Sequence, residues 1–123
     1  MLENRIMEKL SFNILRIGLA ITFLWIGVLI LVNPEAWLGY LRPWAVGLLP
    51  ISDMRILMVT GILDILIGIL LLLNYFILPV TVIGSLHIII ILIVSGITDI
   101  TVRDIGILAG VMALAIDVWS KKI

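Results

Sequence analysis

The chain has 123 residues, of which 63% are hydrophobic and 13% are charged, and eight basic and eight acidic side chains give it a formal net charge of zero. Because a soluble domain is about half apolar and about a quarter charged, this composition excludes a water-soluble fold and makes lipid the expected solvent. The balanced charge excludes a broad basic surface for nucleic acid, and the absence of cysteine excludes disulfides, thiolate nucleophiles and thiolate metal or iron–sulfur sites.

Four apolar stretches are each close to the roughly 20 residues that an α-helix needs to cross the hydrocarbon core. In chain order they cover residues 11–32, 54–73, 77–95 and 102–119. Breaks are expected near Asn33, where Pro34 follows, near Asn74 and near Gly96, because these residue types end helices. The sequence therefore predicts one transmembrane domain over residues 1–123, an all-α integral membrane bundle of four helices.

Two segments outside the spans are predicted to lie at the membrane surface. Residues 34–53 carry Trp37, Tyr40 and Trp44 among apolar residues, and aromatic rings with a polar edge settle at the headgroup level. This pattern predicts an interfacial segment between the first and second helices. Residues 1–10 alternate charged and apolar side chains, which predicts an interfacial helix that leads into the first span.

The lysine and arginine residues predict the orientation of the chain in the cell membrane. They divide five to three between the two predicted membrane faces. One face holds Arg5, Lys9, Arg16, Lys121 and Lys122, and the other holds Arg42, Arg55 and Arg103. Because cytoplasmic segments carry the excess of positive charge, the N- and C-termini of this multi-pass protein are both expected in the cytoplasm.

Three ionisable residues fall inside the predicted spans, where a charged group is costly and is therefore paired, turned inward or functional. At about 1.5 Å of rise per residue, Arg16 lies roughly 8 Å and Asp64 roughly 14 Å from the cytoplasmic ends of the first and second spans. By the same measure His87 lies roughly 15 Å up the third span. An arginine side chain can reach across the difference in depth, so we predict a buried cluster of Arg16, Asp64 and His87.

Two interpretations of this cluster stay open. In the first, Arg16 and Asp64 form a structural ion pair, and His87 is a hydrogen-bonded core histidine. In the second, the cluster is a site for a quinone-like head group or for a proton step, and a quinone is the cofactor that it would take. A single histidine without cysteine or glutamate nearby does not indicate a metal site, and no residue is assigned a catalytic role.

A second polar group is predicted at the outer face and includes Glu35, Arg103 and Asp104. Thr101 followed by Asp104 matches a capping pattern, in which a hydroxyl and a carboxylate satisfy the free amides at the start of a helix. Arg103 lies beside that carboxylate and across from the aromatic segment. It either holds this segment through Glu35 or binds an anion.

Glycines mark the predicted contacts between helices. Gly61 and Gly68 lie two turns apart on the second span, and Gly106 and Gly110 form a face of small residues on the fourth. Because lipid gives no hydrophobic drive for helix association, glycines favour packing by letting backbones approach closely. We expect these residues to pack within the bundle, and the same faces also permit a homo-oligomer.

Four short segments carry a resemblance to a known family. They are the run from Arg16 to Gly27, Asn33-Pro-Glu-Ala-Trp37, Gly61-Ile-Leu-Asp64 with Gly68, and Arg103-Asp-Ile-Gly106. Over residues 11–119 the chain resembles the DoxX-like small membrane proteins, which implies a four-helix membrane bundle. Such proteins include the small subunit of a thiosulfate:quinone oxidoreductase, membrane partners of detoxifying oxidoreductases, a methylamine-utilisation protein and, more distantly, eukaryotic membrane chaperones. The second span of the family often has a carboxylate at the position of Asp64, but members that handle disulfides need cysteines, which this chain lacks.

These observations leave two classes of function open. In the first, the chain is a DoxX-like, non-catalytic or quinone-associated subunit of a membrane redox complex, with Asp64 and His87 near the head group and Arg16 tuning their charge. In the second, it is a structural or chaperone-like assembly protein that packs against other membrane proteins. Both classes place it in the lipid bilayer with membrane or membrane-associated partners, and the sequence has no haem-binding histidine pair or nucleotide-binding loop for catalysis on its own.

Overall fold

The computed structural model describes residues 2–40, 52–96, 98 and 101–122, and these residues form four α-helices and one 3₁₀ helix. In chain order the elements are α1 (Leu2–Val32), η1 (Pro34–Tyr40), α2 (Asp53–Leu73), α3 (Ile77–Ser95) and α4 (Val102–Lys122). No strand occurs in the described ranges. The predicted all-helical fold, with breaks near Asn33, Asn74 and Gly96, is confirmed.

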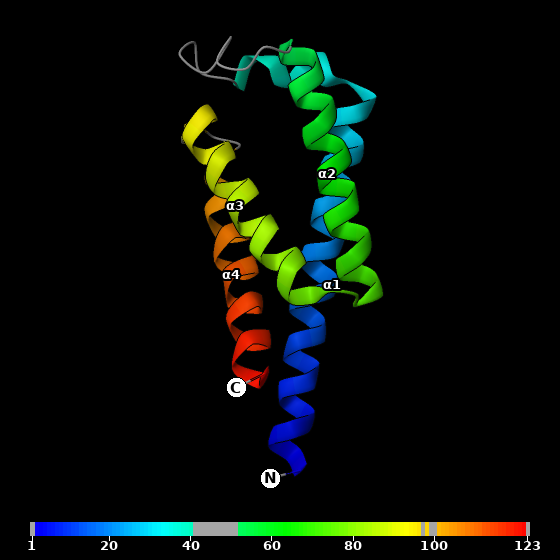
Figure 1. Ribbon diagram of the computed structural model, residues 1–123, viewed down its shortest axis with the longest axis vertical. Helices are drawn as coiled ribbons and strands as arrows, with labels where there is room; N and C mark the ends of the chain where they lie inside the picture. The colour runs from blue at the N-terminus through cyan, green and yellow to red at the C-terminus, as the bar shows by residue number, and fades with distance from the viewer. Residues whose placement is uncertain (1, 41–51, 97, 99–100, 123) are drawn as a thin grey trace.

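The α-helices lie alongside one another as two antiparallel pairs, α1 with α2 and α3 with α4 (Figure 1). The two ends of the chain lie at one end of the molecule, and η1 lies at the other. α2 and α3 come together near the short turn that joins them and separate toward the η1 end.

The turn between α2 and α3 contains two residues with a left-handed backbone. Asn74, at φ 62° and ψ 37°, ends α2, and its N–H donates to the Leu71 carbonyl at 3.2 Å. The N–H of Tyr75 donates to the Leu70 carbonyl at 3.0 Å, and Phe76, at φ 53°, precedes the first residue of α3. Asparagine adopts this conformation more readily than most residues. The chain therefore reverses within three residues and brings the start of α3 beside the end of α2.

α1 is longer than the predicted first span. Residues 2–10, predicted as an interfacial helix leading into the span, are continuous with it in one helix of 31 residues. The side chains of these residues are exposed. Residues 2–17 contain neither glycine nor proline, so no residue in this stretch favours a break.

Glycines bring α1 and α2 into close contact. A Cβ added to Gly27 would lie 2.7 Å from the Gly61 carbonyl oxygen, and a Cβ added to Gly68 would lie 2.9 Å from the Ala20 carbonyl oxygen. A Cβ on Gly61 would itself lie 3.1 Å from the Gly27 carbonyl oxygen. The predicted packing role of Gly61 and Gly68 is confirmed; Gly27 is the partner of Gly61 on α1, and Ala20 is the partner of Gly68.

The glycines of α4 are in looser surroundings. A Cβ on Gly110 would lie 3.3 Å from the Leu19 side chain, whereas a Cβ on Gly106 would meet no atom of the described residues within 4 Å. Only one of the two glycines predicted to form a packing face therefore contacts a neighbouring helix. Gly106 lies on an exposed part of α4.

The packed centre is apolar, and so is much of the outer surface. Phe23, Leu71, Val111 and Leu114 are almost fully buried, whereas many other large apolar side chains face outward, among them Trp25 at 68% exposure. Three helices, α1, α2 and α3, are long and apolar enough to cross a membrane. α4 is of similar length but carries charged residues near both ends. An exposed apolar surface of this extent is the pattern expected where lipid is the solvent.

Candidate functional site

The Asp64 carboxylate and the His87 imidazole meet inside the molecule. His87 Nε2 lies 2.8 Å from Asp64 Oδ1, which is a hydrogen-bond distance, and the two side chains are 10% and 3% exposed respectively. Each residue lies near the middle of its helix, and the antiparallel course of α2 and α3 brings both to the same depth. This part of the predicted cluster is found in the structure.

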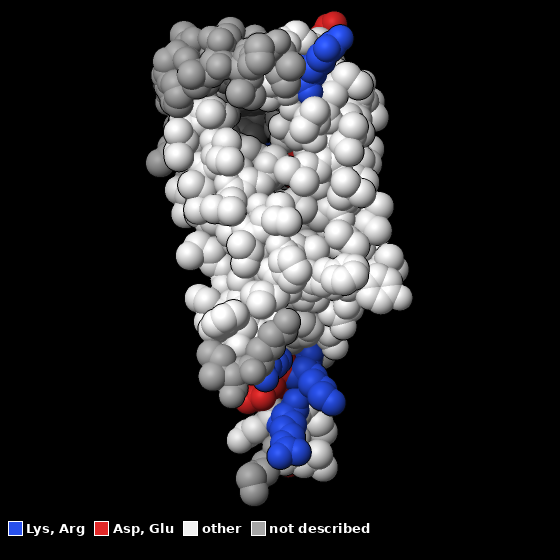
Figure 2. All heavy atoms as spheres, viewed as in Figure 1, with Lys and Arg blue, Asp and Glu red and all other residues white. Residues whose placement is uncertain are grey.

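The pair lies at the floor of a cavity of about 370 Å³, a volume within the range of small-molecule sites. Asp64 and His87 are the lining residues of α2 and α3 that lie farthest from η1. The walls above them are mainly apolar and are formed by Phe23, Ile26, Ile30, Leu57, Ile88, Ile91, Val94 and Ile107. Figure 2 shows the surface hollowed between α2 and α3 near the η1 end. An apolar enclosure around a few polar atoms is the usual composition of a ligand site.

Each side chain of the pair keeps one further polar atom for a ligand. Within the part of the chain that the structure describes, neither Asp64 Oδ2 nor His87 Nδ1 has a hydrogen-bond partner. The Oδ2 atom of an ionised Asp64 accepts, whereas His87 Nδ1 accepts when it is unprotonated and donates when it carries a proton. The pair can therefore offer either a donor or an acceptor to a molecule in the cavity.

Arg16 lies apart from this pair. Its Nη1 donates to the Leu71 carbonyl at 2.7 Å and to the Leu72 carbonyl at 2.8 Å, and its Nη2 donates to Asn13 Oδ1 at 3.4 Å. Leu71 follows Asp64 by two helical turns, roughly 10 Å along the axis of α2. The predicted pairing of Arg16 with Asp64 is therefore wrong. The last carbonyls of a helix have no partner within the helix and form the negative end of its dipole, so they attract the guanidinium even where, as at Leu71, a turn N–H also bonds to them.

The predicted outer polar group is divided between the cavity and the surface. Arg103 and Asp104 line the cavity, whereas Glu35 is exposed on η1. The Arg103 guanidinium carbon lies 5.9 Å from the centre of the Trp37 ring, a cation–π distance, and its Nε lies 4.0 Å from Asp104 Oδ1. Arg103 thus contacts η1 through the Trp37 ring, while the Asp104 side chain is only 10% exposed.

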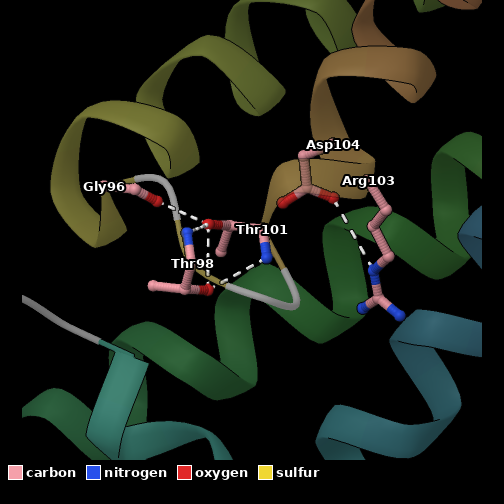
Figure 3. A network of polar contacts seen from close by, with 5 residues as sticks. All are labelled: Gly96, Thr98, Thr101, Arg103 and Asp104. Atoms are coloured by element: carbon pink, nitrogen blue, oxygen red, sulfur yellow. Dashed lines mark hydrogen bonds and ion pairs between the residues drawn. The ribbon is translucent and has the colours of Figure 1, made fainter.

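The connection between α3 and α4 is closed by a network of hydrogen bonds near the cavity (Figure 3). The Thr98 N–H donates to Thr101 Oγ1 at 2.7 Å, and the Thr101 hydroxyl donates to the Gly96 carbonyl. The Thr101 N–H in turn donates to Thr98 Oγ1 at 3.1 Å. The predicted capping bond from the Asp104 amide to the Thr101 hydroxyl is replaced by a bond to the Thr101 carbonyl at 2.9 Å. The hydroxyl is engaged by the preceding loop and is not available to the helix.

Two lining residues were predicted at the membrane surface but not at a site. Trp37 and Tyr40 of η1 both line the cavity, and their ring centroids lie 5.8 Å apart. The spacing of three residues is the one signal in the sequence, because it places both rings on the same side of a helical turn. Trp44, predicted beside them, lies outside the described residues.

Comparison of the chain with models of protein families, with curated proteins and with solved structures finds no match. The described residues contain no group of three or more His, Cys, Asp or Glu side chains that could hold a metal ion. The functional proposal therefore rests on the cavity and on the Asp64–His87 pair within it.

Proposed function

We propose that the chain is a DoxX-like integral membrane protein that crosses the cell membrane four times, with both termini in the cytoplasm. The length and hydropathy of α1, α2 and α3 support three of these crossings. α4 has 21 residues, enough for a fourth, and its charged side chains lie near its ends, where they can reach the headgroups. In this arrangement η1 lies at the outer interface, and the two helix pairs form the bundle.

We propose further that the cavity binds the head group of a lipid-soluble molecule of the quinone class, and that the chain is the quinone-associated subunit of a membrane redox complex. The observation that carries this proposal is the contact between Asp64 and His87 at the floor of an apolar cavity of about 370 Å³. A quinone combines a flat apolar ring with carbonyl oxygens that accept hydrogen bonds. It therefore matches apolar walls that surround a few polar atoms.

In this proposal, residues of the chain bind the quinone head group and orient it in the cavity. His87 Nδ1 donates to a ligand carbonyl when it carries a proton, and Asp64 Oδ2 accepts from the hydroxyl of the reduced ligand. Phe23 and Ile88, both buried in the walls, exclude water and so strengthen that hydrogen bond. The chain has no cysteine, so thiol chemistry has to come from a partner protein.

Quenching of Trp37 fluorescence tests the quinone site, because quinones quench tryptophan at short range and Trp37 lines the cavity. Replacing Trp25, Trp44 and Trp119 by phenylalanine leaves Trp37 as the only tryptophan. In phosphatidylcholine vesicles, a short-chain benzoquinone or naphthoquinone should quench Trp37 in two ways. Quinone bound at the site should give quenching that saturates with quinone concentration, and quinone dissolved in lipid should add quenching that rises linearly. His87→Leu should weaken the saturable binding by about three- to tenfold, the equivalent of one hydrogen bond.

A matched control keeps Trp25 as the only tryptophan. Trp25 lies on α1, is 68% exposed and does not line the cavity, so it should show the linear component alone. Equal saturable quenching of Trp25 and Trp37, or none of either, would contradict the quinone site.

The role that would then remain is assembly of partner membrane proteins. Co-purification from native membrane separates the two roles, since a dehydrogenase or oxidase supports the redox complex and diverse membrane clients support assembly.

A further inference from the structure

The cavity opens to the outside of the molecule between α2 and α3. α1 and α2 are held together by the contacts of Gly27, Gly61 and Gly68, and α3 lies against α4. α2 and α3, in contrast, meet near their turn and diverge toward η1 (Figure 1). The hollow in Figure 2 lies in this gap. The gap between α2 and α3 is therefore the side on which the surface is hollowed toward the outside.

The rim of the opening lies one helical turn from the Asp64–His87 pair. Thr60 precedes Asp64 by one turn on α2, and Ile90 follows His87 by one turn on α3. Because the helices are antiparallel, Thr60 and Ile90 both lie roughly 5 Å from the pair toward η1. Both residues line the cavity, and Ile90 is also 57% exposed on the outer surface. The Ile90 side chain therefore lines the cavity on one side and is exposed on the outer surface on the other.

The outer surface around this rim is apolar. Asp64 and His87, the ionisable residues of this part of α2 and α3, are both turned inward. The hydroxyl of Thr60 is satisfied by the Ile56 carbonyl at 2.9 Å. The exposed neighbours of Thr60 and Ile90 include Val59, Leu86 and Ile93. A hydrated or charged molecule would lose hydrogen bonds to water at this rim, because no side chain there can replace them. A molecule dissolved in the acyl chains has no such hydrogen bonds to lose.

We propose that a lipid-dissolved ligand reaches the cavity sideways from the bilayer, through the opening between α2 and α3, and that Ile90 controls the rate of its passage. This inference rests on the proposed quinone site and adds the path to it. The path reaches the Asp64–His87 pair at the depth of the acyl chains. It avoids the η1 end, where Arg103 and Trp37 are in contact.

Stopped-flow quenching of the protein with Trp37 alone, mixed with bicelles that carry a short-chain benzoquinone, measures the passage. Ile90→Phe enlarges the side chain at the rim, so the association and dissociation rates should both fall about fivefold while Kd stays within about twofold. Ile90→Ala should raise both rates. Ile93→Phe is the matched control, because Ile93 is 59% exposed on the same helix but does not line the cavity, and it should leave both rates unchanged.

Unchanged rates in both Ile90 variants, with saturable binding intact, would overturn the lateral path and leave the quinone site standing. No saturable binding in the parent protein would instead remove the site, and the path with it.

A second measurement needs no quinone. Ile90→Trp, with the four native tryptophans replaced by phenylalanine, should be quenched more strongly by lipids brominated in their acyl chains than by iodide in water. Stronger quenching by iodide would overturn the path whatever the quinone gives.

Discussion

Gly27→Ala is expected to lower the free energy of unfolding, although alanine is the better helix former. A Cβ at this position would lie 2.7 Å from both the Gly61 carbonyl oxygen and Ile65 Cγ1, and 3.0 Å from the Ile65 backbone nitrogen. Ordinary contact begins at 3.4 Å, so α1 and α2 would have to move apart by roughly 0.7 Å. Overpacking costs about 1–3 kcal/mol, and the gain in helix propensity of about 1 kcal/mol offsets part of it. Because part of the obstacle is backbone that cannot rotate away, we expect a net loss of about 1–2 kcal/mol.

Thermal unfolding in detergent, followed by circular dichroism, measures this loss against Gly18→Ala. Gly18 lies on the same helix, but a Cβ there would meet no atom of the described part of the chain within 4 Å. Alanine at position 18 should therefore be neutral or stabilising by up to about 1 kcal/mol. If Gly27→Ala unfolds at or above the temperature of Gly18→Ala, the close approach of α1 and α2 does not limit stability and the reasoning is refuted.

Three further predictions concern the ionisable residues and the orientation. Arg16→Met should lower the unfolding temperature more than Arg16→Lys, because a charged hydrogen bond contributes about 1.5–3 kcal/mol and lysine keeps a cation at the end of α2; equal unfolding temperatures would contradict this role. Asp64→Leu and His87→Leu should each lower the unfolding temperature, and because the two side chains touch, the double variant should lose less than the sum of the two losses. The losses from Arg16→Met and Asp64→Leu should instead add in their double variant. If the Arg16→Met, Asp64→Leu double variant were more stable than either single variant, the ion pair predicted from the sequence would be supported after all. Single cysteines in place of Asn4 and Tyr40 should label from opposite membrane faces, and labelling of position 4 from outside would reverse the proposed orientation.

The helices and their breaks could be predicted from the sequence because both depend on local chemistry. An apolar run of about 20 residues indicates a span without knowledge of its neighbours. Asn33 with Pro34, Asn74 and Gly96 mark ends that the backbone requires; Gly96, for example, has φ 69°, where a side chain is strained. The continuity of α1 through residues 2–10 was not predicted, because alternating charge describes the surroundings of a helix and not where it begins.

One part of the site was predicted, because the depth of a residue in the bilayer follows from counting residues along its helix. The other part was not, because the sequence does not show which backbone carbonyl a side chain will reach. Counting residues brought Asp64 and His87 to one level, and the structure joins them. The same counting allowed Arg16 to reach Asp64, but its partners are the carbonyls of Leu71 and Leu72. Carbonyls are common to every residue and leave no pattern in a sequence. Which helix end comes near an arginine depends on how α1 and α2 pack.

The bonds from Arg16 to the end of α2 bear on how the chain is inserted during its synthesis. An arginine inside a helix that enters the bilayer alone is costly, and at the helix centre the cost reaches roughly 2.5–3.5 kcal/mol on translocon scales. The carbonyls that compensate this cost belong to α2, the next long helix to be made, and the contacts of Gly27 and Gly68 join the same two helices. In the proposed topology, α1 and α2 form a hairpin in which the carbonyls of α2 offset the cost of burying Arg16. Such a hairpin would be able to leave the translocon as a unit, before α3 and α4 have been translated. In the proposed topology, the second hairpin of α3 and α4 would then dock onto a surface that is already folded.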